Sequence, residues 1–182
     1  MSRKLSIIAV LLCASLPLAA QNGAKNGEWR SYAAEPGSTK YSPLDQINRD
    51  NVAKLELAWQ YRTGAVKDNP DLKKYIDFQN TPTLLPPAAG GHLVVCDPFG
   101  KVIALEPATG TPRWTMDPKI NKTPFAGRFK CRGVEYWADD TAAPDAACAH
   151  RLFLATADKR LIAMDARDGR RCAGFGVNGE VN

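Results

Sequence analysis

Residues His92–Trp114 read HLVVCDPFGKVIALEPATGTPRW, and a second stretch of the same design, RLFLATADKRLIAMDARDGRRCA, occupies Arg151–Ala173. Each copy has an apolar run, a polar turn, a second apolar run, an acidic residue, a turn with glycine and a further strand. In register, the matching pairs are Ile103 with Ile162, Ala104 with Ala163, Glu106 with Asp165, and Gly110 with Gly169. Such a unit buries its faces only against its neighbours, so the repeat predicts β-blades stacked around an axis.

The rest of the chain follows the same pattern of short apolar runs between turn residues. Runs that suit strands are Leu57–Tyr61, His92–Cys96, Lys101–Leu105, Arg151–Thr156 and Arg160–Met164. One helical turn is expected over Asn48–Lys54, and Asn69–Lys73 and Pro118–Gly127 are expected to be loops. The fold class predicted is all-β, with two antiparallel blades over residues 78–117 and 130–176. Residues 28–64 should add an extra strand and loops.

Composition and charge argue against a nucleic-acid-binding protein. Of 182 residues, 45% are hydrophobic and 24% charged, and the formal net charge is +5. No cluster of lysine and arginine is interleaved with aromatic residues, so a nucleic-acid partner is not expected.

The first twenty residues have the features of a secretory signal peptide. Arg3 and Lys4 precede the apolar stretch Leu5–Leu18, and the small residues Ala19 and Ala20 follow. The stretch is short for a membrane span. We therefore expect a signal peptide over residues 1–20, a mature domain over 21–182, and export to the periplasm.

Cysteine usage agrees with export. Beyond Cys13 the chain has Cys96, Cys131, Cys148 and Cys172, which permit two disulfides with three connectivities. We predict that Cys148 pairs with Cys131 or Cys172, and that Cys96 is a buried free thiol. The cysteines form no CxxC pair, and His92 and His150 each open an apolar run, so a zinc site is not expected.

Two segments resemble the pyrroloquinoline quinone (PQQ)-dependent dehydrogenases. Ala104–Trp114 is similar to the tryptophan-docking motif A-x-D-x-x-T-G-K-x-x-W of quinoprotein propellers, with Glu106 in place of Asp and Thr111 in place of Lys. The second copy has Ala173 where tryptophan is expected. The opening segment, in Lys40–Asn48 and in the later Ala58-Trp59 and Thr63-Gly64, resembles the start of the mature enzymes. The resemblance implies an eight-bladed propeller, of which this chain contains two to three blades.

The resemblance also implies two cofactor-binding residues. Gln79, in Phe78–Pro82, stands where many members have a glutamate that faces the quinone. Arg132, in Lys130–Trp137, matches the CRGV segment of the glucose-dehydrogenase-like branch, where the arginine pairs with a carboxylate of PQQ. A guanidinium suits that task because its planar fork meets a carboxylate bidentately. Both side chains should therefore point to the same side, toward the axis.

The function implied is oxidation of a sugar, polyol or alcohol, with electrons passed to a respiratory acceptor, a quinone or cytochrome c. The CRGV segment favours the sugar or polyol branch. A Ca²⁺ ion would polarise the quinone carbonyl and an Asp would act as general base, and by family order the metal ligands and this Asp are expected beyond Asn182. Asp139-Asp140 is interpreted as an exposed turn instead. Peripheral contact with a membrane is left open.

Two alternatives stand beside this interpretation. The first is a non-catalytic β-propeller scaffold of the outer-membrane assembly type, which shares the docking repeats but lacks the opening segment and the CRGV loop. The second, compatible with the dehydrogenase, is a fragment that has no activity of its own.

Overall fold

The computed structural model describes residues 24, 28–35, 37–123 and 127–182. Within these ranges the helical structure consists of three short 3-10 helices, η2 (Val52–Lys54), η3 (Pro70–Tyr75) and η4 (Pro87–Ala89). The predicted signal peptide, residues 1–20, lies outside the described residues. In the part that is described, no helix has the length and apolarity that crossing a membrane requires.

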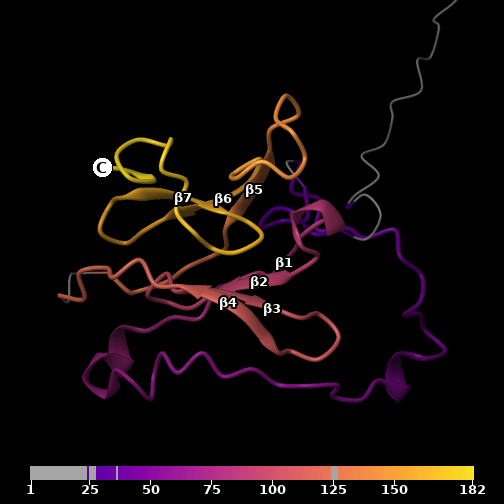
Figure 1. Cartoon of the computed structure of the whole chain (residues 1–182). Coiled ribbons are helices and arrows are strands. Elements are labelled where there is room, and N and C mark those ends of the chain that lie inside the picture. Colours follow the sequence, from indigo (N-terminus) through magenta and orange to yellow (C-terminus); the bar gives the residue numbers. More distant parts are fainter. Residues whose placement is uncertain (1–23, 25–27, 36, 124–126) are drawn as a thin grey trace, which may run out of the picture.

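Eight strands form two four-stranded antiparallel sheets, each in simple meander order (Figure 1). The first sheet contains β1 (Thr83–Leu84), β2 (Leu93–Cys96), β3 (Val102–Leu105) and β4 (Pro112–Met116). The second contains β5 (Glu135–Ala138), β6 (His150–Ala155), β7 (Leu161–Asp165) and β8 (Glu180–Val181). The all-β prediction is confirmed, as are the two antiparallel units in the predicted parts of the chain.

The sequence repeat corresponds to one structural register. Val95 pairs with Ile103 between β2 and β3, and the repeat-equivalent residues Leu154 and Ile162 pair between β6 and β7. The two apolar runs of each copy are therefore the two central strands of a blade. Because side chains alternate between the faces of a strand, the two sheets meet through opposite faces of the repeat: Leu154 and Ile162 belong to the shared core, whereas their equivalents Val95 and Ile103 do not.

The two sheets pack face to face around one core (Figure 1). The first sheet contributes Val94, Val102 and Ala104, and the second contributes Leu152, Leu154, Ile162 and Met164, all fully buried. Every one of these side chains is apolar, so the burial of hydrophobic surface is the main force that joins the sheets. The result is two adjacent blades, not two independent domains.

Tryptophans connect successive units through glycine turns. A Cβ built on Gly169, in the turn after β7, would lie 2.5 Å from Cε3 of Trp114 in β4. The same holds for Gly110, after β3, where an added Cβ would lie 2.5 Å from Cε3 of Trp59. Gly110 and Gly169 have positive φ, +69° and +73° respectively, a conformation that favours glycine. In each turn the tryptophan ring covers the glycine. Trp114 thus docks between the two blades, as the similarity of Ala104–Trp114 to the tryptophan-docking motif implies.

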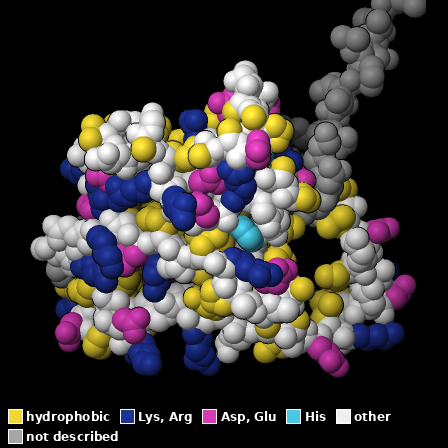
Figure 2. Space-filling view, viewed as in Figure 1, with side chains coloured by type: hydrophobic (Ala, Val, Ile, Leu, Met, Phe, Trp, Pro, Cys, Tyr) yellow, Lys and Arg dark blue, Asp and Glu magenta, His cyan; other side chains and the backbone are white. Residues whose placement is uncertain are grey.

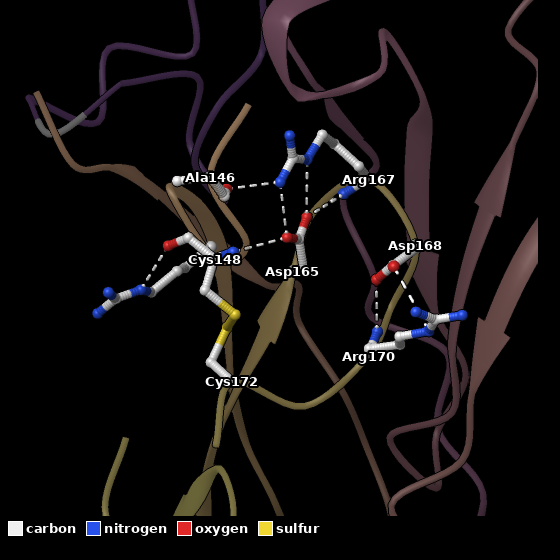
Figure 3. Close-up of a disulfide and its surroundings, with 8 residues drawn as sticks. Ala146, Cys148, Asp165, Arg167, Asp168, Arg170 and Cys172 are labelled. Carbon is white, nitrogen blue, oxygen red and sulfur yellow. Dashed lines mark hydrogen bonds and ion pairs between the residues drawn. A yellow bond between two sulfur atoms is a disulfide. The ribbon is translucent and has the colours of Figure 1, made fainter. Parts of the chain in front are cut away.

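The acidic residue of the repeat stabilises the turn differently in the two copies. Asp165 Oδ1 accepts the backbone N–H of Arg167 at 3.0 Å, and its Oδ2 accepts the N–H of Cys148 at 2.7 Å (Figure 3). Burial raises the pKa of Asp165, but these bonds and the Arg167 guanidinium outweigh burial and lower it. Glu106 instead pairs with the side chain of Arg113.

The segment before the first sheet departs from prediction. Leu57–Tyr61 forms no strand, because no described strand lies beside it to complete a ladder, and Leu57 is 83% exposed. The stretch that leads to η2 also exposes large apolar side chains, namely Tyr41, Leu44, Ile47 and Val52. Figure 2 shows a hollow between this exposed stretch and the body of the sheets.

Two further boundaries were wrong. Pro70–Tyr75 forms η3, although Asn69–Lys73 was predicted to be a loop; Pro70 at the first helical position favours this turn. The second blade also extends beyond residue 176. After Arg171, which bridges Met164, the chain leaves the sheet as a loop and returns as β8 at Glu180–Val181.

Candidate functional site

Two segments from successive blades run side by side at the predicted cofactor site. The chain before β1 pairs with the chain before β5: Ile76 forms a parallel bridge with Phe129, and the Thr81 N–H donates to the Arg132 carbonyl at 2.9 Å. The Arg132 Nε donates to Gln79 Oε1 at 3.3 Å. The two predicted site residues therefore meet, on one side of the molecule.

A third residue, Asp77, was missed in the sequence. Its Oδ2 accepts Gln79 Nε2 at 2.8 Å, so the Gln79 amide is held between a carboxylate and a guanidinium. Asp77 and Gln79 lie two positions apart in an extended segment, which places both side chains on one face. The two-residue spacing could have predicted that Asp77 lies beside Gln79, but only if the segment was already known to be extended.

The outer part of the Arg132 guanidinium is available to a ligand. Arg132 is exposed, and in the described part of the chain its Nη atoms have no hydrogen-bond or ion-pair partner. The Nη pair is the fork that binds a carboxylate. Arg128 and Lys130, on the same connection, are also exposed and add positive charge. The residues present thus fit one carboxylate of an anionic cofactor.

A disulfide bond lies directly beside the site. Cys96, the last residue of β2, bonds to Cys131, the neighbour of Arg132, with a Cα–Cα distance of 6.0 Å. The prediction that Cys96 is a free thiol was wrong, because the stacking of blades, which the sequence does not show, brings β2 to this loop. Asn80 Nδ2 lies 3.2 Å from the Cys96 sulfur.

The second disulfide is one of the two predicted alternatives. Cys148 bonds to Cys172, with a Cα–Cα distance of 5.8 Å (Figure 3). It joins the loop before β6 to the loop that follows Arg171 and precedes β8. Cys131 is thereby left for Cys96, so this pairing and the first one are mutually consistent.

Gly133 packs against the segment before β1. An added Cβ would lie 3.5 Å from the Thr81 carbonyl oxygen, in ordinary contact, and would face the Gln79 segment. The glycine therefore belongs to the packing between the two segments.

The paired carboxylates Asp139 and Asp140 follow β5 in a turn. Asp139 Oδ1 accepts the N–H of Thr141 at 3.0 Å and its hydroxyl at 2.6 Å, which lowers the pKa of Asp139. The interpretation as a turn is confirmed. Among the described residues, no group of three or more His, Cys, Asp and Glu side chains is placed to hold a metal ion.

An apolar groove of about 700 Å³ lies beside the site, between the extended segment that carries Trp59 and the first sheet. Its lining includes Trp59, Phe78, Leu93, Val95 and Leu105. The groove exposes the face of the first sheet opposite the shared core. In the described part of the chain no further sheet covers this face.

The two four-stranded meanders are stacked and joined by tryptophan docking. An amide, Gln79, precedes the first sheet, and an arginine, Arg132, precedes the second. Together these features define a pair of quinoprotein-type propeller blades. The family model described as PQQ: glucose/ethanol/alcohol dehydrogenase, beta-propeller domain, matches residues 29–182. The chain therefore belongs to the family of PQQ-dependent dehydrogenases.

Individual relatives agree with this assignment. The chain is 33% identical over 171 residues to quinoprotein glucose dehydrogenase A of Acinetobacter calcoaceticus, which covers 88% of this chain and 21% of that protein. It is 35% identical over 184 residues to the quinate/shikimate dehydrogenase (quinone) of Acinetobacter baylyi, covering 92% and 22%. The quinohemoprotein alcohol dehydrogenase from Comamonas testosteroni superposes with a TM-score of 0.62 at 31% identity, covering 82% and 19%. The chain thus spans about a fifth of the length of these relatives.

Proposed function

We propose that residues 29–182 are part of a PQQ-dependent dehydrogenase that oxidises a CH–OH group of a sugar or polyol. The observation that carries the proposal is the contact between Arg132 and Gln79, which leaves the Nη fork of Arg132 exposed at the convergence of two blades. The named relatives are dehydrogenases of glucose, quinate or shikimate, and alcohol, which does not favour a non-catalytic scaffold.

Arg132 would bind one carboxylate of PQQ through its Nη atoms. Its Nε is already engaged by Gln79, so the plane of the guanidinium is fixed before the cofactor arrives. Such preorganisation lowers the entropy lost on binding. Asp77 fixes the Gln79 amide in turn.

Gln79 retains one free donor. An amide Nε2 carries two hydrogens, and Asp77 accepts one of them, so the other can reach an oxygen of the cofactor. Gln79 cannot supply the negative charge of the glutamate found at this position in many relatives. Its role would be orientation of the arginine and donation of one hydrogen bond.

When bound, PQQ supplies the redox chemistry, as the acceptor of a hydride from the substrate carbon. We propose that Ca²⁺ accompanies it as the Lewis acid and that the metal ligands and the general base belong to further blades. The periplasm as the compartment, and a quinone or cytochrome c as the electron acceptor, are part of the same proposal. The disulfides are compatible with an oxidising compartment.

The test is cofactor affinity in the whole enzyme, meaning the propeller completed by the remaining blades. Arg132→Ala should weaken PQQ binding by about 2–3 kcal/mol, the value of a charge-assisted pair, which is roughly 30- to 150-fold in Kd. Arg170→Ala is the matched control, since Arg170 is an exposed arginine that pairs with Asp168 in the turn after β7. An unchanged PQQ titration of the Arg132 variant would remove the basis of the proposal.

A further inference from the structure

The Cys96–Cys131 disulfide lies beside both halves of the candidate cofactor site. Cys131 is the direct neighbour of Arg132, and the Cys96 sulfur lies 3.2 Å from Nδ2 of Asn80, the direct neighbour of Gln79. Both cysteines are buried, at 3% and 7% exposure. A single covalent bridge therefore adjoins each of the two residues that would hold the cofactor.

The connection that carries Arg132 has little other restraint. Between Met116, where β4 ends, and Glu135, where β5 begins, the described residues form no regular element apart from the bridge at Phe129. Phe129 is buried against Phe99, with ring centroids 5.1 Å apart. After Phe129, the backbone of the Arg132 loop accepts a hydrogen bond from the Thr81 N–H at the Arg132 carbonyl, and a long one of 3.5 Å from the Thr83 hydroxyl at the Val134 carbonyl.

The disulfide adds a covalent restraint that joins this loop to a strand. Cys96 is held in the β2–β3 ladder, where it pairs with Val102. A crosslink of residues 35 apart limits the conformations open to the intervening chain, and here it fixes the end of the loop to the strand. The Arg132 backbone is thereby clamped between β2 and the Gln79 segment.

We propose that Cys96–Cys131 is a positioning disulfide for the cofactor site: it holds Arg132 against Gln79, so that the guanidinium is preorganised for a carboxylate of the cofactor. The Cys148–Cys172 bridge has no such role, because it joins the loop before β6 to the excursion after β7. This inference rests on the proposed function. It adds that cofactor binding depends on the oxidation state of one particular pair of cysteines.

The experiment compares two double variants of the whole enzyme, Cys96→Ala/Cys131→Ala and Cys148→Ala/Cys172→Ala. Each removes one bridge, and both should lower the melting temperature. The affinity of the apo-protein for PQQ is measured by equilibrium dialysis. We expect the first variant to bind PQQ at least tenfold more weakly, and the second to stay within about threefold of the parent.

A reversible form of the same test covers the case in which the first variant does not fold. In Cys148→Ala/Cys172→Ala the remaining described bridge is Cys96–Cys131. A dithiol reduces it: two electrons and two protons pass to the disulfide, giving two cysteine thiols, and the dithiol closes to a cyclic disulfide. After the reagent is removed, PQQ affinity should be at least tenfold weaker, and reoxidation should restore it.

The outcomes separate this inference from the proposed function. If loss of the bridge leaves PQQ affinity unchanged while Arg132→Ala weakens it, the positioning role is refuted and the cofactor site stands. If neither change affects affinity, the cofactor site itself is refuted. If the two double variants lose affinity equally, the effect is general destabilisation and the positioning role is again refuted.

Discussion

Replacing Gly169 by alanine should separate the two blades locally. Gly169 has φ of +73°, a conformation that costs an L-residue about 1–2 kcal/mol. The new Cβ would also lie 2.5 Å from Cε3 of Trp114, so the ring must move off the turn. If about half of the roughly 200 Å² that a tryptophan buries is lost, this adds up to about 2.5 kcal/mol. Because the ring relaxes in part, we expect a total of about 2–4 kcal/mol.

Hydrogen–deuterium exchange of the whole enzyme measures this local opening. In peptides covering residues 112–116 and 161–172, a loss of about 2–4 kcal/mol corresponds to amide exchange roughly 30- to 900-fold faster. Gly174→Ala is the matched control, because an added Cβ there meets nothing within 4 Å. If Gly169→Ala exchanges no faster than Gly174→Ala, the tryptophan contact does not hold the blades together and the reasoning is wrong.

Three further changes test other parts of the structure. Burial raises the pKa of Asp158, but the bonds from Arg160 and Thr156 prevail and lower it to about 2. Its stabilising effect is therefore complete above the ordinary pKa of 3.8 and is lost as pH falls toward 2. Asp158→Asn should cost up to about 2 kcal/mol at pH 7, and thermal melts should show the difference from the parent shrinking between pH 4 and pH 3. Trp59→Ala frees the segment that Trp59 fixes to Gly110, so limited trypsin digestion should cleave at Arg62 faster than in the parent; equal rates would argue against this anchor. Residues 21–182 expressed alone should aggregate, because the apolar groove beside Trp59 is uncovered. With PQQ and Ca²⁺ added they should show no dye reduction with glucose, ethanol or quinate, because the proposed metal ligands and general base belong to further blades. Turnover by a monodisperse sample would place the active site within this chain.

The central strands were predictable from the sequence and the shortest edge strands were not. The strands β2, β3, β6 and β7 are apolar runs bounded by turns, and the repeat confirms each by the other. The edge strands β1 and β8 have two residues each, too short for any period to appear. In the other direction, Leu57–Tyr61 has the composition of a strand, but strand formation needs a partner, and no described strand supplies one.

The candidate site shows the same division. That Gln79 and Arg132 face the same side followed from the repeat, because equivalent connections of successive blades converge. The roles of Asp77 and of the Cys96–Cys131 bridge depend on the parallel approach of two irregular segments. No local pattern encodes such an approach, so these contacts are visible only in three dimensions.

The docking of tryptophan on glycine has a consequence for how such a chain can grow in evolution. Trp59 and Trp114 each lie on a glycine of the unit that follows in the chain, Gly110 and Gly169 respectively. Tandem duplication of a unit that carries both the tryptophan and the glycine therefore inserts a docking pair that already fits, and the array of blades can lengthen without new surfaces. The second unit has Ala173 where the tryptophan is expected, so a duplicate of that unit would not bring this docking contact with it.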